Sequence, residues 1–134
     1  MAFVREIPVR FPDVDFARVV YYPRFFDYCH RVFEDFFEVE MGIPYAQMLQ
    51  QRKVGYPSVH ARADFKAPLR FGDIARIEMT TVKVGAASIT SRYRVSSATQ
   101  LCAELEIVTA TIELDSFKGI PVPDDVRAAF ERCR

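Results

Sequence analysis

The stretch from Phe11 to Phe37 reads FPDVDFARVVYYPRFFDYCHRVFEDFF, and it decides the fold. After Pro23 its apolar side chains recur at three- and four-residue steps, which is typical of an amphipathic helix. Proline suits the first helical position because that position has no intrahelical N–H bond to lose, and Gly42 suits the position just beyond a helix end. We therefore predict a long helix from Pro23 to Gly42 whose buried face is formed by Phe25, Phe26, Cys29, Val32, Phe33, Phe36 and Phe37.

Outside this helix the hydrophobic period changes to two, which is typical of strands. In the segment after Pro57, Val59, Ala61, Ala63 and Phe65 alternate with polar residues, and this pattern predicts a half-buried strand. The strands that we predict are Phe3–Phe11, Val59–Lys66, Ile74–Val84, Ser88–Ser96 and Leu101–Asp115. Short helices are predicted at Pro44–Arg52 and near the C-terminus, where Asp124 is the expected cap.

Successive strands joined by short turns pair antiparallel, and a sheet must bury its apolar face against another element. The only long apolar helix is the Phe-rich one. The sequence therefore predicts an α+β arrangement, with an antiparallel five-stranded sheet wrapped around one long central helix, in a single domain over residues 1–134. One helix does not cover a whole sheet edge, so we expect self-association through an edge strand.

The composition excludes several classes of protein. Eighteen basic residues balance eighteen acidic ones, so no global charge favours nucleic acid or an anionic membrane. No apolar run approaches the ~20 residues of a membrane span, and the N-terminal segment lacks the apolar run of a signal peptide. Three cysteines without CxxC spacing and only two histidines argue against a disulfide scaffold or structural zinc. We expect a soluble cytoplasmic protein that needs no metal or redox cofactor.

Asp13 and Asp15 lie one residue apart in the loop before the helix. They are explained by a solvated loop turn, or by a metal site, although no histidine or third acid lies nearby in sequence. A third explanation uses their position, because a helix N-terminus carries free N–H groups and partial positive charge. Such an end stabilises an oxyanion, and a carboxylate beside it can attack a carbonyl or activate water.

The segment DVDFARVVYYPRFFDYCH, residues 13–30, resembles the signature of the 4-hydroxybenzoyl-CoA thioesterase family of hotdog-fold acyl-CoA thioesterases. The segment VGYPSVHARADFKAPLRFGDIARIEMTTVKVGAASI, residues 54–89, is similar to the later strands of that family. The resemblance extends over nearly the whole chain. It includes the glycine before a strand, the P-x-x-x-G-D turn, and the glycine and serine between strands.

The resemblance implies that Asp15 is the catalytic aspartate, either as nucleophile or as general base toward the thioester. It implies that the backbone N–H near Tyr22 holds the thioester oxygen, and that Asp13 fixes the loop. It further implies an acyl-CoA or acyl-carrier-protein substrate. The partners would be copies of the same chain, in a dimer or a tetramer of two dimers, with the site between two subunits.

Two residues depart from the family pattern, and both lie in the loop. Arg18 occupies the position of a family glycine, and Phe16 that of a frequent proline. Glycine tolerates backbone geometries that arginine does not, so we expect the loop to bend differently. Arg18 would then bind a substrate carboxylate or a CoA phosphate, or partly block the site. The second outcome predicts a non-catalytic acyl-CoA or lipid-binding protein. A hotdog hydratase is disfavoured because Val20, not histidine, stands five residues after Asp15.

Other candidate substrate-binding residues are polar side chains near the predicted strands and helix. By the same resemblance, His30 stands where the aromatic-CoA enzyme carries an acid for the substrate hydroxyl, and this change disfavours 4-hydroxybenzoyl-CoA itself as the substrate. Otherwise His30 is a helix residue on the side that faces a partner subunit. The further candidates are Tyr56, Ser58, His60 and Ser88. The family's basic turn is Gly85-Ala86-Ala87-Ser88 here, so a CoA phosphate would need other cations, for which solvated strand positions offer Arg62, Lys66, Arg92 and Arg94.

Overall fold

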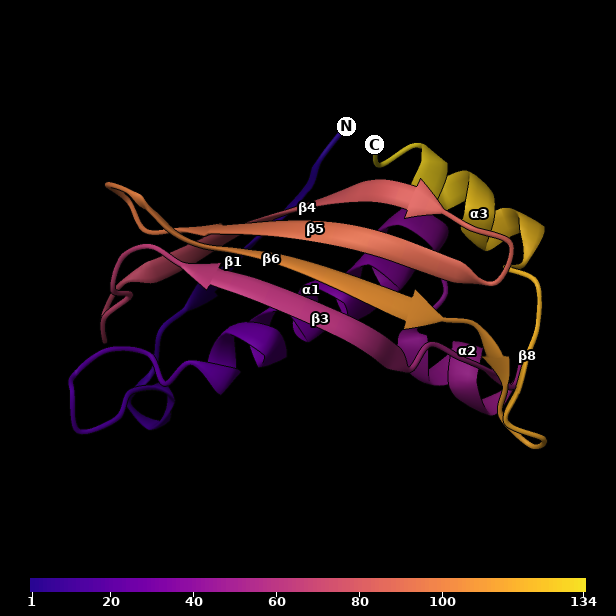
Figure 1. The fold of residues 1–134 in the computed structure, drawn as a ribbon, viewed down its shortest axis with the longest axis horizontal. Coiled ribbons are helices and arrows are strands. Elements are labelled where there is room, and N and C mark those ends of the chain that lie inside the picture. The colour runs from indigo at the N-terminus through magenta and orange to yellow at the C-terminus, as the bar shows by residue number, and fades with distance from the viewer.

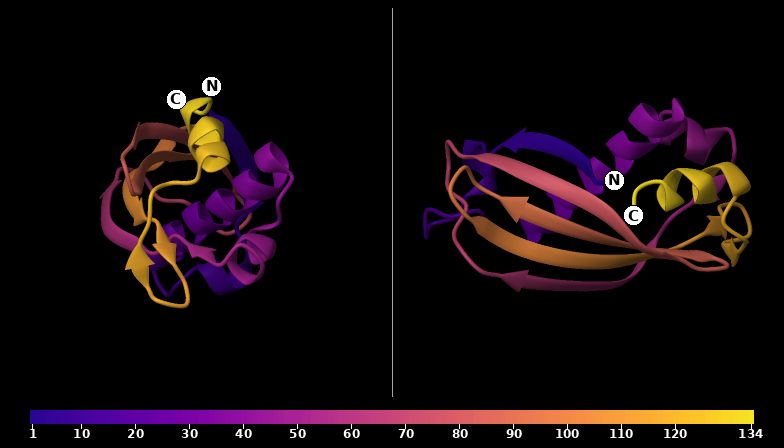
Figure 2. Two further views of the ribbon diagram at one scale, coloured as in Figure 1. Left: turned by 90° about the vertical axis from the view of Figure 1, so that its right-hand side faces the viewer. Right: turned by 90° about the horizontal axis from the view of Figure 1, so that it is seen from above.

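The computed structural model describes residues 1–134 and contains the predicted five-stranded antiparallel sheet. The strand order is β1-β4-β5-β6-β3, and each neighbouring pair is antiparallel. Figure 2 shows the sheet curving around the central helix. The strands are β1 (Phe3–Pro8), β3 (Ser58–Phe65), β4 (Ile74–Val84), β5 (Ser88–Ser96) and β6 (Leu101–Ala110).

The central helix α1 (Pro23–Met41) lies against the concave face of the sheet, as predicted. Pro23 begins it, and Gly42 ends it with φ at +68°, a left-handed conformation that costs glycine little. Its apolar face is buried, and the ring of Phe36 packs against Phe3 at 5.4 Å and against Phe130 at 4.4 Å. The buried helix residues are Phe25, Tyr28, Cys29, Val32, Phe33, Phe36 and Phe37.

Smaller elements close the end of the molecule that carries α3 (Asp124–Glu131) (Figure 1). The helix α2 (Tyr45–Gln50) follows α1, and a second sheet joins β2 (Val54–Gly55), β7 (Ile112–Glu113) and β8 (Lys118–Gly119). A Cβ atom at Gly55 would lie 2.6 Å from Leu114 Cδ2, so a larger residue there would force the Leu114 side chain to shift. Arg52 joins this region to α3 through two hydrogen bonds to Asp125, at 2.7 and 3.0 Å.

Three predicted boundaries of helices and strands differ from the structure. The first strand ends at Pro8, and a 3-10 turn (Phe11–Asp13) replaces its predicted end. The predicted strand Leu101–Asp115 is broken after Ala110, because Thr111 leaves β6 and donates its N–H to Ala87. Asp124 is the first residue of α3 and makes no cap; Pro123 occupies the cap position.

Edge strand β3 is exposed along almost its whole length in the single chain, so the predicted half-buried strand is wrong for the isolated subunit. Val59 is 62% exposed and Phe65 48% exposed. The alternation of apolar and polar residues is present, but the apolar side extends beyond the cover that α1 provides. No helix in the structure is long and apolar enough to span a membrane.

Candidate active site

The residues between β1 and α1 form a small hairpin at the end of the molecule opposite α3 (Figure 1). The Asp15 N–H donates to the Val19 carbonyl at 3.2 Å, and Val14 lies opposite Val20. Residues 16–18 form the loop, across which the Arg18 N–H donates to the Asp15 carbonyl at 2.9 Å. Hairpins with three-residue loops commonly place their last loop residue in the left-handed conformation. We call residues 13–21 the Asp15 hairpin.

Arg18 adopts this left-handed conformation, with φ at +71°. A non-glycine residue loses about 1–2 kcal/mol in such a conformation, and glycine adopts it freely. The structure therefore explains why glycine suits this position, and it corrects our expectation of a different bend, since the arginine accepts the glycine-type turn. The Arg18 side chain is exposed and forms no ion pair.

Asp13 anchors the hairpin to the central helix. It is only 7% exposed, and its Oδ2 accepts hydrogen bonds from the Tyr28 hydroxyl at 2.8 Å and the Arg10 N–H at 3.0 Å. Burial, followed by the contact with Asp13, raises the pKa of Tyr28, so the phenol remains a hydrogen-bond donor. Arg24 adds a longer charge contact, 3.9 Å from Asp13 Oδ1. Asp13 thus makes the loop-fixing contacts that the family resemblance implies.

Asp15 has one carboxylate oxygen held and the other uncommitted. Its Oδ1 accepts a hydrogen bond from the Ala17 N–H at 2.8 Å, which orients the exposed side chain. Tyr22 precedes α1, and its backbone N–H donates no hydrogen bond within the chain. The Tyr21 N–H donates to the Asp13 carbonyl at 2.9 Å, so hairpin and helix start are joined directly. The structure therefore places a free N–H at the positive end of a 19-residue helix, and a carboxylate with one free oxygen in the hairpin that leads into it.

Two apolar cavities flank the groove between α1 and β3. The first, which we call the hairpin cavity, has a volume of about 490 Å³ and is lined by Val19, Val20, Tyr22, Phe25, Phe65, Ala67, Pro68 and Leu69. The second, which we call the helix cavity, has a volume of about 380 Å³ and is lined by Phe26, Asp27, His30, Phe33, Tyr56, Ser58, Ala61, Tyr93, Ile107 and Thr109.

The helix cavity gathers three of the predicted substrate-binding residues, His30, Tyr56 and Ser58. His30 lies exposed on α1, with its Nδ1 3.5 Å from Glu34 Oε1 and its ring 6.0 Å from that of Tyr45. Tyr56 is buried, and burial raises its pKa, so it contributes a neutral wall. Their role in substrate binding stays a prediction, but the structure places them around one cavity.

His60 and Ser88 do not lie in this cavity. A bulge separates Ser58 from His60, and His60 alternates with Ala61, which lines the helix cavity, so His60 belongs to the outer face of the sheet. Ser88 precedes the buried Ile89 and also faces outward. Among the predicted cations, Arg62 and Arg92 share Glu106 on that outer face, at 3.9 and 3.1 Å.

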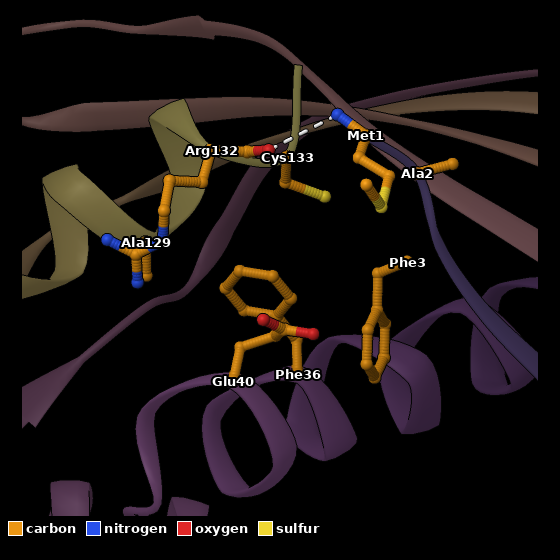
Figure 3. A pocket seen from close by; sticks show the side chains of 8 residues that line it. All are labelled: Met1, Ala2, Phe3, Phe36, Glu40, Ala129, Arg132 and Cys133. Carbon is orange, nitrogen blue, oxygen red and sulfur yellow. Dashed lines mark hydrogen bonds between the residues drawn. The ribbon is translucent and has the colours of Figure 1, made fainter.

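A third cavity lies between β1, α1 and α3 and contains none of the predicted site residues (Figure 3). Its volume is about 420 Å³, and the Met1 ammonium donates to the Arg132 carbonyl beside it. Burial raises the pKa of the Cys133 thiol, which disfavours the thiolate needed for nucleophilic chemistry. Its acid, Glu40, belongs to the last turn of α1, whose dipole end is negative. The Asp15 hairpin is therefore the better candidate for a hydrolytic site.

Comparison with known proteins places the chain among thioesterases. The sequence profile of the Thioesterase-like superfamily matches residues 9–130. The chain belongs to this superfamily. The match begins before the Asp15 hairpin and ends in α3, so it covers the site and the whole five-stranded sheet except the first strand.

The most similar characterised proteins include CoA-thioester hydrolases. The chain is 29% identical over 134 residues to a 1,4-dihydroxy-2-naphthoyl-CoA hydrolase of Nostoc punctiforme, covering 100% of the chain and 90% of that protein. It is 30% identical to the protein of the same name from Synechocystis, covering 96% and 94%. The crystal structure of a Synechocystis 1,4-dihydroxy-2-naphthoyl-CoA thioesterase superposes with a TM-score of 0.88 at 29% identity, over 97% of this chain and 96% of that one. A gentisyl-coenzyme A thioesterase superposes with a TM-score of 0.84 at 26% identity, over 93% and 99%.

Replacement of Tyr28 by phenylalanine tests the anchor of the hairpin. The change leaves the buried Asp13 carboxylate without its phenol donor, and we expect the free energy of unfolding to fall by about 1–3 kcal/mol. Urea denaturation measures the loss. Tyr21→Phe is the matched control, because the exposed Tyr21 hydroxyl makes no hydrogen bond within the chain, and it should change stability by less than about 0.5 kcal/mol. Equal losses of stability in Tyr28→Phe and Tyr21→Phe would contradict the role of the Tyr28–Asp13 hydrogen bond as the anchor of the hairpin.

Substitution of Arg18 tests the left-handed turn. Arg18→Val should lower the free energy of unfolding by about 1–2 kcal/mol, because a branched side chain is most strained there. Arg18→Gly should leave stability unchanged or raise it by up to about 1 kcal/mol, the relief of strain being partly offset by the freedom glycine gives the unfolded chain. Thermal and urea denaturation are the measurements. Ala17→Val is the control, since Ala17 lacks a positive φ, and a loss equal to that of Arg18→Val would rule out the strain.

Proposed function

We propose that the protein hydrolyses acyl-CoA thioesters to a free acid and CoA, with a hydroxylated aromatic acyl group as the preferred substrate class. Membership of the thioesterase-like superfamily and the names of the relatives support this activity. The observation that carries the proposal is local: Asp15, with one carboxylate oxygen uncommitted, belongs to the hairpin that leads directly into α1, and Tyr22, at the cap of that helix, has a free N–H.

The thioester carbonyl would accept a hydrogen bond from the Tyr22 N–H. Negative charge develops on this oxygen as the carbonyl carbon is attacked, and the N-terminal end of α1 stabilises it. The helix end contributes up to ~2 kcal/mol in a favourable, partly buried geometry, and a well-placed oxyanion donor contributes ~3–4 kcal/mol. Both act more strongly in the transition state than on the uncharged carbonyl, which is the condition for catalysis.

Asp15 would supply the attack in one of two ways. As a general base, it takes a proton from a water whose oxygen then bonds to the carbonyl carbon. As a nucleophile, its free oxygen bonds to that carbon and forms an anhydride, which water later cleaves. In both routes the carbon–sulfur bond breaks and the CoA sulfur leaves as thiolate and takes up a proton. The Ala17 N–H holds Oδ1, which leaves Oδ2 for either task.

The edge strand β3 supports a dimer in which two copies of the strand pair antiparallel. An exposed edge with apolar side chains is a template for pairing, and two-fold pairing is the commonest way in which identical chains assemble. In such a pair the Ser58 end of one strand meets the Phe65 end of the other. The ring of Phe65 lies 6.2 Å from that of Tyr22, so the helix cavity of one subunit would adjoin the Asp15 hairpin of its partner.

The helix cavity suits an aromatic acyl group. Its walls are rings and aliphatic side chains, which exclude water from the thioester, and His30, Asp27 and Ser58 supply polar groups at its rim. A ring hydroxyl can donate to the Asp27 carboxylate or accept from Ser58. Two relatives are named after 1,4-dihydroxy-2-naphthoyl-CoA and gentisyl-CoA, thioesters whose acyl groups are hydroxylated aromatic rings.

A non-catalytic acyl-CoA-binding protein is the alternative that Arg18 suggested. The left-handed conformation of Arg18 keeps the turn, and its side chain is exposed and forms no ion pair with Asp15. This geometry favours the enzyme, and turnover measurements decide between the two.

Asp15→Asn should lower thiol release from aromatic acyl-CoA thioesters by about 10²- to 10⁴-fold, because the amide neither attacks nor accepts the proton. Asp115→Asn is the matched control, since Asp115 is exposed at the opposite end of the molecule, between β7 and β8. Thiol release followed with a disulfide reagent measures both variants. Equal activity of wild type and Asp15→Asn would reject the role of Asp15. Binding of acyl-CoA without turnover by the wild type would establish the binding protein instead.

Mixed dimers test whether the site is shared between subunits. Ser58→Phe should block the helix cavity, and Asp15→Asn removes the acid, so each homodimer is inactive. A random mixture of the two chains, co-expressed with different tags, should recover about a quarter of wild-type activity, because half of the two-fold dimers are mixed and each has one intact site. Asp15→Asn co-expressed in equal amount with wild type should retain about half of wild-type activity, because half of all sites in randomly paired dimers contain the intact acid. No recovery in the double mixture would place acid and cavity in one subunit.

A further inference from the structure

Three arginines at the hairpin end of the molecule have no ion-pair partner, although most arginines of the chain do. Arg10, Arg18 and Arg70 are exposed, and none forms a salt bridge. On the outer face of the sheet, Arg62 and Arg92 share Glu106, although Arg94 on that face is unpaired as well. The hairpin end therefore carries three exposed guanidinium groups without an ion-pair partner, in a chain of zero net charge.

Backbone hydrogen bonds bring these three arginines together from distant parts of the sequence. Arg70 is bridged to Val19, the neighbour of Arg18, and the Val20 N–H donates to the Leu69 carbonyl at 2.7 Å. On the other side of the same turn, the Val9 N–H donates to the Asp73 carbonyl at 2.9 Å, which places Arg10 beside residues 70–73. The turn itself is held by the Asp73 carboxylate, which accepts the Arg70 N–H at 2.9 Å, and by Gly72 with φ at +92°.

Two exposed aromatic rings lie beside the arginines. Phe11 is 74% exposed and Phe71 is 58% exposed, and their ring centroids are 5.9 Å apart in an edge-to-face arrangement. Each follows one of the arginines in sequence, Arg10 and Arg70. Exposed phenylalanine faces next to unpaired guanidinium groups are chemically suited to a ligand that carries both a planar ring and phosphates.

We propose that this surface binds the nucleotide half of CoA, with the phosphates on Arg18, Arg70 and Arg10 and the adenine on Phe11 and Phe71. This inference rests on the proposed function, since CoA enters as the leaving group of the thioester. Arginine binds phosphate oxygens through paired N–H donors. An adenine base stacks on an aromatic side chain, as every nucleic-acid base can. The three phosphates of CoA are the anions that complement three unpaired arginines.

In the proposed arrangement the thioester would lie at Asp15 and Tyr22, and the pantetheine arm would run from there to the arginines. Arg70 is bridged to Val19, the neighbour of Arg18, and Phe71 and Phe11 directly follow Arg70 and Arg10 in sequence, so the rings lie next to the guanidinium groups. Three acids lie nearby: Asp13 is buried and within 3.9 Å of Arg24, Asp15 shares the turn of Arg18, and the Asp73 carboxylate accepts the Arg70 N–H. None of these carboxylates forms an ion pair with Arg10, Arg18 or Arg70, so the three guanidinium groups remain free to bind phosphate. The turn Gly85–Ser88 between β4 and β5 offers no cation.

Kinetics with three thioesters of the same acyl group test the site: the acyl-CoA, the acyl-dephospho-CoA, which lacks the 3′-phosphate, and the acyl-pantetheine, which lacks the nucleotide. Arg70→Gln should raise KM for the acyl-CoA about five- to tenfold, as expected for loss of a charged hydrogen bond near the surface, and leave its kcat unchanged. The same variant should leave KM for the acyl-pantetheine unchanged. Phe71→Ala should raise KM for both nucleotide-containing substrates. Arg132→Gln is the control, since Arg132 is exposed and unpaired beside the third cavity.

The outcomes separate this inference from the proposed function. If the wild type hydrolyses thioesters but Arg70→Gln keeps its KM for acyl-CoA, or loses affinity equally for acyl-pantetheine, the nucleotide site is rejected and the thioesterase stands. The nucleotide site is also rejected if Arg70→Gln raises KM only for an acyl-carrier-protein substrate. If the wild type hydrolyses no thioester, calorimetric titration of 3′,5′-ADP decides: binding weakened about five- to tenfold in Arg70→Gln supports the site, and absence of binding overturns it.

Discussion

The hydrogen bond from the Tyr28 hydroxyl to the buried Asp13 carboxylate is the contact on which the proposed site depends. Tyr28 belongs to the buried face of α1, and Asp13 begins the hairpin, so this contact fixes the loop to the central helix. The backbone bonds of the hairpin then hold Asp15 opposite Val19, and the bond from the Tyr21 N–H to the Asp13 carbonyl joins the hairpin to the residues that begin α1. A charged acceptor in a buried place is costly to leave unpaired, which keeps the hairpin against the helix.

Most of the fold could be predicted from the sequence because its elements have strong local signals. The Phe-rich face and its flanking Pro23 and Gly42 predicted α1, and the turn residues around Gly72 and Gly85 bounded β4 and β5. The break after Ala110 escaped prediction because Thr111 is as typical of a strand as its neighbours; its departure is caused by contacts with Ala87 and Ile120. The exposure of β3 was not predicted either, because a hydrophobic period of two shows which side of a strand is apolar and not whether another element covers that side.

The candidate site was predicted only in part. Asp15 and Tyr22 follow from the family signature, and the structure shows the hairpin that carries Asp15 and the helix start that leaves the Tyr22 N–H free. His30, Tyr56 and Ser58 meet around one cavity, whereas the bulge at Val59 sends His60 to the other face.

Tyr28 was missed as the anchor, although its place on the buried face and the nearby acid were visible signals. Arg10 and Arg70 were missed because only the backbone bridges to Val9 and Val19 bring them beside Arg18.

The central claim is that the start of α1, through the Tyr22 N–H, polarises a thioester carbonyl beside Asp15. The most direct test is the infrared carbonyl stretch of a ¹³C-labelled aromatic acyl-CoA bound to Asp15→Asn, compared with the same thioester in water. The account predicts a clear shift to lower frequency on binding, because a hydrogen bond and the helix end together weaken the carbon–oxygen double bond. A bound carbonyl that absorbs at the same frequency as in water, or higher, would contradict it.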